Sequence, residues 1–253
     1  MRLKITVALV LSVILSNYTS CKKKEEPNKI IDGLPVNSSQ KVVPAQAAQQ
    51  LLLLKRDSLN IIVPVINKLG LANQSFTELS GPDSQSRYSF QITDNSYGTA
   101  TFTLQFRNSS NAIIDPIKTQ TSTTTLNSVV VTGTGNSSKF SYSENLTITL
   151  ETVGKANSKK FLTGTSNFNG SGTSVTFTFP APGAESSFQG LIGGGVTGSG
   201  TGAGGEATTL SLSFASNHEA DGAIAWEGQQ GGIHFAEDGK GYIVTNEARL
   251  LID

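Results

Sequence analysis

Strict alternation of apolar and polar residues, which begins near Arg87 and continues almost to the C-terminus, limits the fold of this chain more than any other feature. Residues 99–106 alternate threonine or glutamine with alanine, phenylalanine and leucine, and the same period of two recurs in residues 88–93, 175–179 and 209–214. Because successive side chains of a strand point to opposite faces, this pattern predicts strands with one buried and one solvated face. The turn residues between the runs favour an antiparallel sheet of about ten strands, most of them paired with their neighbours in sequence.

Residues 44–69 have the spacing of a helix instead. Apolar residues recur at intervals of three and four and gather on one broad face, whereas polar residues such as Lys55 lie mostly elsewhere. Pro44 suits the first turn of a helix and Gly70 suits a C-terminal cap. Pro64 should kink or split the helix. Since few Lys and Arg residues lie on the polar face, we interpret this segment as a core helix that covers a sheet and not as a membrane-surface helix.

One charged residue interrupts an apolar strand face. Residues 139–152 are typical of a single long strand, and Glu144 is the only charge on the face that also carries Phe140, Tyr142 and Leu146. A charge that is buried alone costs several kcal/mol, so we do not expect Glu144 in a dry core. Two interpretations stay open: Glu144 contacts a ligand in a cavity, or it marks a bulge, the rim of the sheet or a break into two shorter strands.

A glycine-rich segment lies between two of the predicted strands. Residues 181–206 lose the two-residue period, which predicts a flexible surface loop. Its apolar residues Phe188, Leu191 and Ile192 would let its first part dock over the sheet or over the mouth of a cavity. The segment also contains a G-x-G-x-x-G spacing, but it lacks the strand-to-helix context of a dinucleotide site, so we do not expect nucleotide binding.

Residues that could perform catalysis or bind metal are few. Acidic residues accompany both histidines, His218 and His234, but no spacing matches a zinc site, and we expect no metal and no cofactor. We also expect no catalytic residue, because motifs such as G-x-S-x-G are missing from the sequence. Alternation places His234 on the polar face of a strand. Trp226 is either an anchor in the core or a stacking platform for a sugar at the rim. The candidate ligand-binding residues are Glu144, Trp226, Phe188 and Leu191.

The first twenty residues have the layout of a secretory signal peptide. Arg2 and Lys4 precede an apolar run at residues 5–15, and small polar residues follow. This run is shorter than the roughly twenty residues that a membrane-spanning helix needs. Cys21 comes next and is the only cysteine of the chain, so no disulfide can form within it.

The residues around Cys21 resemble the export signals of bacterial lipoproteins. Residues 18–21, Tyr-Thr-Ser-Cys, resemble a relaxed lipobox in which Tyr18 replaces the usual leucine, and this resemblance implies that Cys21 is acylated and anchors the chain in a membrane. The Lys and Glu cluster at residues 22–26 resembles the signal that sends Bacteroidetes-type lipoproteins to the outer face of the outer membrane. The alternatives are an ordinary secreted protein with a free thiol and a solvated charged tether. We favour the cell surface; the leaflet stays open.

Charge and length complete the sequence-based expectations. The chain has 19 basic and 19 acidic residues and no basic stripe, so we expect no nucleic-acid partner. We divide it into the signal peptide at residues 1–20, a lipidated cysteine with a flexible tether at residues 21–43, and a single domain at residues 44–253. That domain should be mainly β (α+β), with an N-terminal helix followed by a long-stranded antiparallel meander that curls into a barrel-like or two-layer sheet.

These features favour a non-enzymatic lipoprotein that faces the cell surface or the periplasm. It would bind an apolar small ligand or lipid, or support an assembly of the cell envelope through a protein partner. One alternative is a membrane-embedded β-barrel, because alternating strands also suit that architecture. Another is a surface lipoprotein that binds or hydrolyses carbohydrate.

Overall fold

The computed structural model describes residues 34–37, 41–69, 71, 73–119 and 125–252. The predicted signal peptide, Cys21 and the Gly70 cap lie outside these residues. The described helices and strands belong to one unit of the chain, Val36–Asp253. In chain order they are β1 (Val36–Asn37), α3 (Val43–Lys68), β2 (Tyr88–Asp94), β3 (Gly98–Asn108), β4 (Ile113–Ile114), α4 (Pro116–Thr119), β5 (Leu126–Asn136), β6 (Ser141–Leu150), β7 (Lys160–Gly170), β8 (Thr173–Ser187), β9 (Gly190–Gly193), β10 (Gly195–Thr201), β11 (Ala207–Phe214), β12 (Ala220–Trp226), β13 (Gln229–Phe235), β14 (Gly241–Val244) and β15 (Arg249–Ile252).

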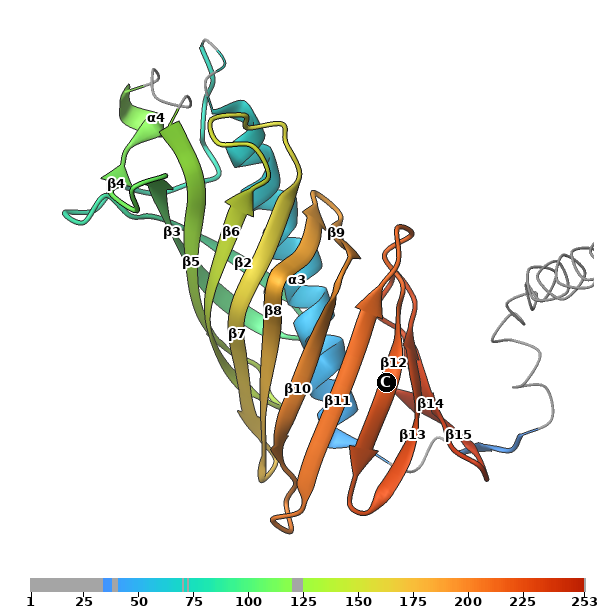
Figure 1. Cartoon of the computed structure of the whole chain (residues 1–253). Helices are drawn as coiled ribbons and strands as arrows, with labels where there is room; N and C mark the ends of the chain where they lie inside the picture. Colours follow the sequence, from blue (N-terminus) through green and yellow to red (C-terminus); the bar gives the residue numbers. More distant parts are fainter. Residues whose placement is uncertain (1–33, 38–40, 70, 72, 120–124, 253) are drawn as a thin grey trace, which may run out of the picture. The chain divides into compact units, whose positions relative to one another are not determined.

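The fifteen described strands form one sheet that is not closed (Figure 1). Its order is β1-β15-β14-β13-β12-β11-β10-β8-β7-β6-β5-β3-β2, with β4 and β9 attached to β3 and β8. Among the described strands the pair β1 and β15 is parallel and the others are antiparallel. The predicted mainly β fold with an N-terminal helix and an antiparallel sheet is therefore confirmed. Since Val36–Asn37 pair with β15, the fold begins inside the segment that we expected to be tether.

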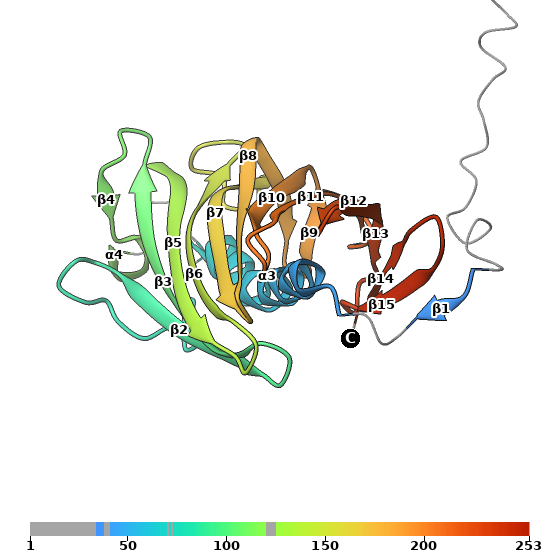
Figure 2. The same cartoon turned by 90° about the horizontal axis from the view of Figure 1, so that it is seen from below.

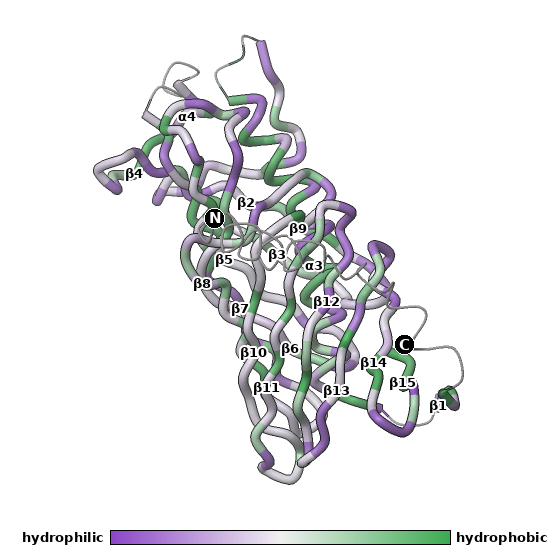
Figure 3. The backbone as a smooth tube through the Cα atoms, turned by 45° about the vertical axis from the view of Figure 1, so that its right-hand side comes forward, coloured by the Kyte–Doolittle hydropathy of each residue, from purple (hydrophilic) through white to green (hydrophobic). Residues whose placement is uncertain are grey.

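The two-residue period places one row of side chains from each strand on the inner face. On β3, for example, Phe102, Leu104 and Phe106 are fully buried, while the residues between them are partly exposed. Figure 3 shows this alternation of hydrophobic and hydrophilic residues along the strands. Aromatic rings continue the row across the sheet, because Phe102 stacks on Phe90 at 5.0 Å and Phe168 meets Phe177 edge to face at 5.7 Å. Such cross-strand pairs stabilise the inner face in addition to the area that they bury.

Helix α3 lies inside the curve of the sheet. In Figure 2 the strands arch over the helix, with β2 and β15 at the two ends of the arch. Side chains around most of the helix are buried, which is typical of a helix that is enclosed in a core. In the part of the chain that the structure describes, no helix combines the length and the apolar character needed to span a bilayer.

The helix is not split at Pro64, because α3 continues as far as Lys68. A proline inside a helix costs about 3 kcal/mol or more. Ile62, Val63 and Ile66 on either side of it are buried, and each such side chain contributes roughly 1.5–3 kcal/mol when it leaves water. Packing inside the sheet therefore offsets the local preference of Pro64 to split the helix.

Residues 181–206 are not a flexible loop, so this prediction is wrong. Strand β8 continues to Ser187, and the rest of the segment supplies β9 and β10, which pair with β8 and β11. The glycines permit close packing here: a Cβ at Gly198 would lie 3.0 Å from the ring of Phe177. Glycine in a strand often marks such a close approach, and sequence alone does not distinguish it from flexibility.

Gly164 offers a test of this packing role. It lies at a bulge in β7, has a φ of +117°, and a Cβ there would overlap the carbonyl oxygen of Asn145. We expect Gly164→Ala to lower the free energy of unfolding by about 2 kcal/mol, because both the backbone conformation and the contact become strained. The measurement is urea denaturation of the full chain.

Gly193→Ala is the matched control, since its Cβ would lie 3.5 Å from the nearest atom, Glu185 Cβ, at a backbone conformation that alanine adopts. This variant should unfold within about 0.5 kcal/mol of the wild type. Equal losses in the two variants would show that Gly164 has no special conformational role.

Candidate functional site

An ion pair is buried between α3 and the middle of the sheet. The ammonium of Lys55 donates to Oε2 of Glu144 on β6, and the two side chains are 2% and 0% exposed. Ser166 on β7 donates to the same oxygen at 3.3 Å. The expectation that Glu144 avoids the core is therefore wrong, because α3 supplies a cation that we had placed on the outer side of the helix. Glu144 marks neither a bulge nor the rim, since its pairing with β5 and β7 is continuous.

Small residues make room for this buried polar cluster. A Cβ at Gly133, which lies opposite Glu144 on β5, would overlap the hydroxyl of Tyr142 and come within 3.0 Å of Glu144 Cγ. Among the described residues, the Tyr142 hydroxyl and Glu144 Oε1 have no hydrogen-bond partner. Burial raises the pKa of Tyr142 well above its usual value, and the nearby Glu144 carboxylate adds to this shift. Glu144 thus contacts the helix through Lys55.

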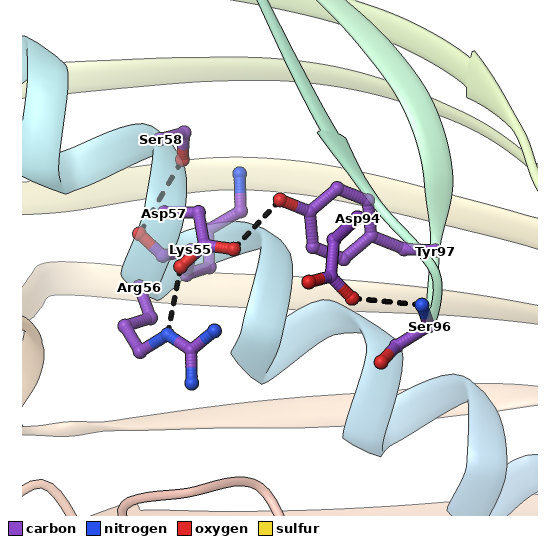
Figure 4. A network of polar contacts seen from close by, with 7 residues as sticks. All are labelled: Lys55, Arg56, Asp57, Ser58, Asp94, Ser96 and Tyr97. Carbon is purple, nitrogen blue, oxygen red and sulfur yellow. Dashed lines mark hydrogen bonds and ion pairs between the residues drawn. The ribbon is translucent and has the colours of Figure 1, made fainter.

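The turn between β2 and β3 holds α3 from one side (Figure 4). The hydroxyl of Tyr97 donates to Asp57 Oδ2 at 2.6 Å, and Arg56 Nε donates to the other carboxylate oxygen of Asp57 at 2.7 Å. Nearby, Gln50 Nε2 donates to the carbonyl oxygen of Ser96 at 3.0 Å. Burial, followed by the hydrogen bond to Asp57, raises the pKa of Tyr97 far above its usual value. These contacts fix the turn on the helix.

Another part of α3 borders a small pocket. It has a volume of about 30 Å³ and is lined by Arg56, Leu191, His218 and Gly239 among others. This space suits about one water molecule and is far below the roughly 300 Å³ at which small-ligand pockets begin. Gln49 closes the same side, because its Nε2 donates to the carbonyl oxygen of Gly239 at 3.0 Å. Among the described residues, the pocket at Gln189, Gly190 and Leu191 is therefore small.

The structure does not assemble the four candidate ligand-binding residues into one site. Trp226 is 3% exposed on the inner face of β12, which confirms the core interpretation. Leu191 is also buried, whereas Phe188 is 51% exposed in the turn between β8 and β9. Glu144 on β6 is five strands away from Trp226 in the sheet, or roughly 24 Å at the usual strand spacing.

The two histidines lie in different surroundings. His234 points outward, as alternation predicts, and its Nδ1 is 2.8 Å from Asp221 Oδ1 on the neighbouring strand. His218 lies in the turn between β11 and β12 and borders the small pocket beside α3. Within the residues that the structure describes, no three His, Cys, Asp or Glu side chains come together as a metal site requires.

Sequence reasoning missed a hollow on the outer face of β11–β14. Its volume is about 510 Å³. Its floor is a cross-strand row of short side chains, Ser211, Ala223 and Gly232, which ends at Val244. Gln230 and other uncharged residues line the hollow beside this row. Alternation marked these positions only as solvated, and the shortness of the outward side chains was the available signal.

A row of longer side chains runs beside the hollow. Asp221 contacts His234, and the His234 and Tyr242 rings lie 5.0 Å apart. The guanidinium of Arg249 lies 4.1 Å from the centre of the Tyr242 ring. Ring stacking and cation–π contact hold these side chains against one another. They form a fixed wall next to a floor of short side chains.

Lys160 is another residue that sequence reasoning missed. It begins β7 on the inner face, is 4% exposed, and donates from Nζ to the carbonyl oxygen of Ser158 at 2.9 Å. Burial lowers the pKa of Lys160 to about 8. The charged ammonium of Lys160 is therefore less favourable here than in water.

Removing one partner of the buried ion pair should lower the free energy of unfolding more than removing both partners. We expect Glu144→Leu to lower the free energy of unfolding by about 3–5 kcal/mol, because Lys55 is left as an unpaired buried charge. The double variant Lys55→Met with Glu144→Leu should recover most of this loss, as measured by urea denaturation. Lys68→Met, which breaks the exposed pair with Glu78, serves as control and should change stability by about 1 kcal/mol or less. If the losses in Glu144→Leu alone and in Lys55→Met alone simply add in the double variant, the two groups are not coupled.

Lys160 should make stability depend on pH in the alkaline range. Its folded-state pKa of about 8 is below the ordinary value of 10.5, so the unfolded chain binds the extra proton between these two values. Stability should therefore rise from about pH 8 to about pH 10.5 relative to Lys160→Met, and this difference should be constant below pH 8. Thermal unfolding across this range measures the effect. Lys160→Arg, which keeps its charge, should show no such rise, and a rise in that variant would assign the effect to another group.

Comparisons with family models, with curated proteins and with solved structures found no match for this chain. Its function is therefore inferred from its own residues, chiefly from the packed inner face and the hollow on the outer face.

Proposed function

We propose that this chain is a non-enzymatic lipoprotein of a bacterial outer membrane, exposed at the cell surface, that binds its ligand or partner on the outer face of its sheet. One observation carries the second half of this proposal: α3 fills the inner side of the sheet and is fixed there by the ion pair between Lys55 and Glu144. A ligand that entered from that side would have to displace the helix and leave two charges unpaired. The outer face offers a hollow that needs no such rearrangement.

The anchor rests on the residues around Cys21. Acylation of this cysteine would supply the membrane partner, and several acyl chains on one residue bind a bilayer firmly. Residues 22–35 separate Cys21 from β1, the first described strand.

An apolar small ligand or lipid, which the sequence features favour, is the other ligand class. It would need an apolar cavity between helix and sheet. The pocket beside α3 holds about 30 Å³ and includes the charged groups Arg56 and Glu237, which suits water better than an acyl chain. This geometry favours binding on the outer face.

Two variants of the chain test the proposal together. In the full chain, incorporation of labelled palmitate should depend on Cys21 and be lost in Cys21→Ser. When residues 1–21 are replaced by an ordinary cleavable signal peptide, the exported protein should be soluble without detergent, and its native mass should equal that of the polypeptide alone. Labelling that persists in Cys21→Ser would refute the anchor, and a co-purifying lipid would refute a packed interior.

A further inference from the structure

We propose that the hollow on the outer face of β11–β14 binds a neutral glycan chain. This inference rests on the proposed function, because it assigns a ligand class to the outer face. The starting point is a glycine in the floor of the hollow that the fold does not require.

Gly232 is in the middle of β13, where glycine weakens a strand. Its φ is not positive, and a Cβ there would lie 3.9 Å from the nearest atom, the carbonyl oxygen of Gly222. Neighbouring glycines differ: a Cβ at Gly231 would lie 2.6 Å from the carbonyl oxygen of Val244, and one at Gly222 would overlap the carbonyl oxygen of Ser211. Close packing thus accounts for Gly222 and Gly231, whereas Gly232 leaves open space on the outer face.

The strand register places this open space beside other short side chains. Gly232 pairs with Ala223 on one side and with Val244 on the other, and Ala223 pairs with Ser211. The floor therefore crosses four strands, or roughly 14 Å at the usual strand spacing. Its volume of about 510 Å³ falls within the roughly 300–1,000 Å³ of small-ligand sites.

The lining determines which ligands fit. The lining contains the hydroxyl groups of Thr209 and Ser211, the carboxamides of Gln230 and Asn246, and the methyl groups of Ala223, Ala225 and Val244, and it contains no charged residue. The Thr245 hydroxyl is occupied by its own turn, because it donates to the carbonyl oxygen of Ala248 and accepts from the backbone N–H groups of Glu247 and Ala248. Hydroxyls and carboxamides both donate and accept hydrogen bonds. A glycan without charge presents the matching surface, since its hydroxyl groups surround faces of C–H groups.

Other ligand classes match less well. An anion would lack a cation in the lining, because the nearby Arg249 lies against the Tyr242 ring. An acyl chain would bury the hydroxyls and carboxamides without partners, which costs free energy for each group. An extended peptide gains most of its affinity from a free strand edge, whereas β12 and β13 are paired on both sides.

The wall beside the floor gives the hollow a fixed shape. Asp221 lies two residues before Ala223 on β12, its side chain is 58% exposed, and its Oδ1 contacts His234. A carboxylate oxygen in this position accepts hydrogen bonds from neighbouring hydroxyl groups of a sugar. Because the wall is held by its own contacts, little side-chain entropy is lost on binding.

The test is calorimetric titration of the full chain with cellohexaose, maltohexaose, xylohexaose and mannohexaose, alongside hexagalacturonate, dodecanoate and an uncharged peptide of Gly, Ser, Thr and Asn. We expect at least one of the four neutral hexasaccharides to bind. Gly232→Phe fills the hollow and should weaken that binding about tenfold or more, which corresponds to about 1.4 kcal/mol. Ala223→Phe should act in the same way and covers the case in which Gly232→Phe fails to fold.

Ser143→Phe is the matched control, because Ser143 points outward on β6, several strands from the hollow. It should bind as the wild type does. The proposal is overturned if none of the four neutral hexasaccharides binds, if both hollow variants bind unchanged, or if the anion, the fatty acid or the peptide binds more tightly. Any of these results leaves the proposed function standing as long as Cys21 is still acylated and the protein carries no lipid.

Discussion

The ion pair between Lys55 and Glu144 determines how the helix sits in the sheet. Apolar side chains around α3 would pack against an apolar inner face in several positions, since burial of area has no direction. A shift by one helical turn, about 5.4 Å, would instead separate two buried charges. Removing charges from water is costly, so the pair does not need to add stability to act as a register device. Its contribution is to make the other positions of the helix unfavourable.

Once the helix is fixed, the open form of the sheet follows. An α-helix with its side chains is about 10–12 Å wide, and the strands must curve around it to bury both surfaces. The two ends of the curved sheet then contact the helix and do not pair with each other. The β2–β3 turn reaches Asp57 and Gln50 through Tyr97 and Ser96, and the β13–β14 turn reaches Gln49 through Gly239. Contacts with the helix thus replace the strand pairing that closure would require.

Local pattern predicted the strands and the helix because alternation and helical spacing are properties of neighbouring residues. The ion pair joins residues 89 positions apart, and nothing near Glu144 in the sequence indicates that a lysine lies opposite. The error at residues 181–206 has a related cause. Glycine permits both flexibility and close packing, and which of the two applies depends on the neighbouring strand. At Gly198 it is close packing, because the Phe177 ring lies against it. For the candidate site, one of the two interpretations of Trp226, an anchor in the core, is confirmed, but the outer hollow was missed.

The hollow was missed because folding constrains the two faces of a strand differently. On β13, Ile233 and Phe235 point inward and are buried, so their size is set by the core. The outward residues that alternate with them, Gly232 and His234, face solvent, and many side chains would serve the fold equally well there. Gly232 is a poor choice for strand stability among these, because it adds backbone freedom to the unfolded chain and removes a cross-strand contact with Ala223. A residue that weakens its strand without relieving any close contact is best explained by what lies outside the sheet, and at this position that is a space for ligand.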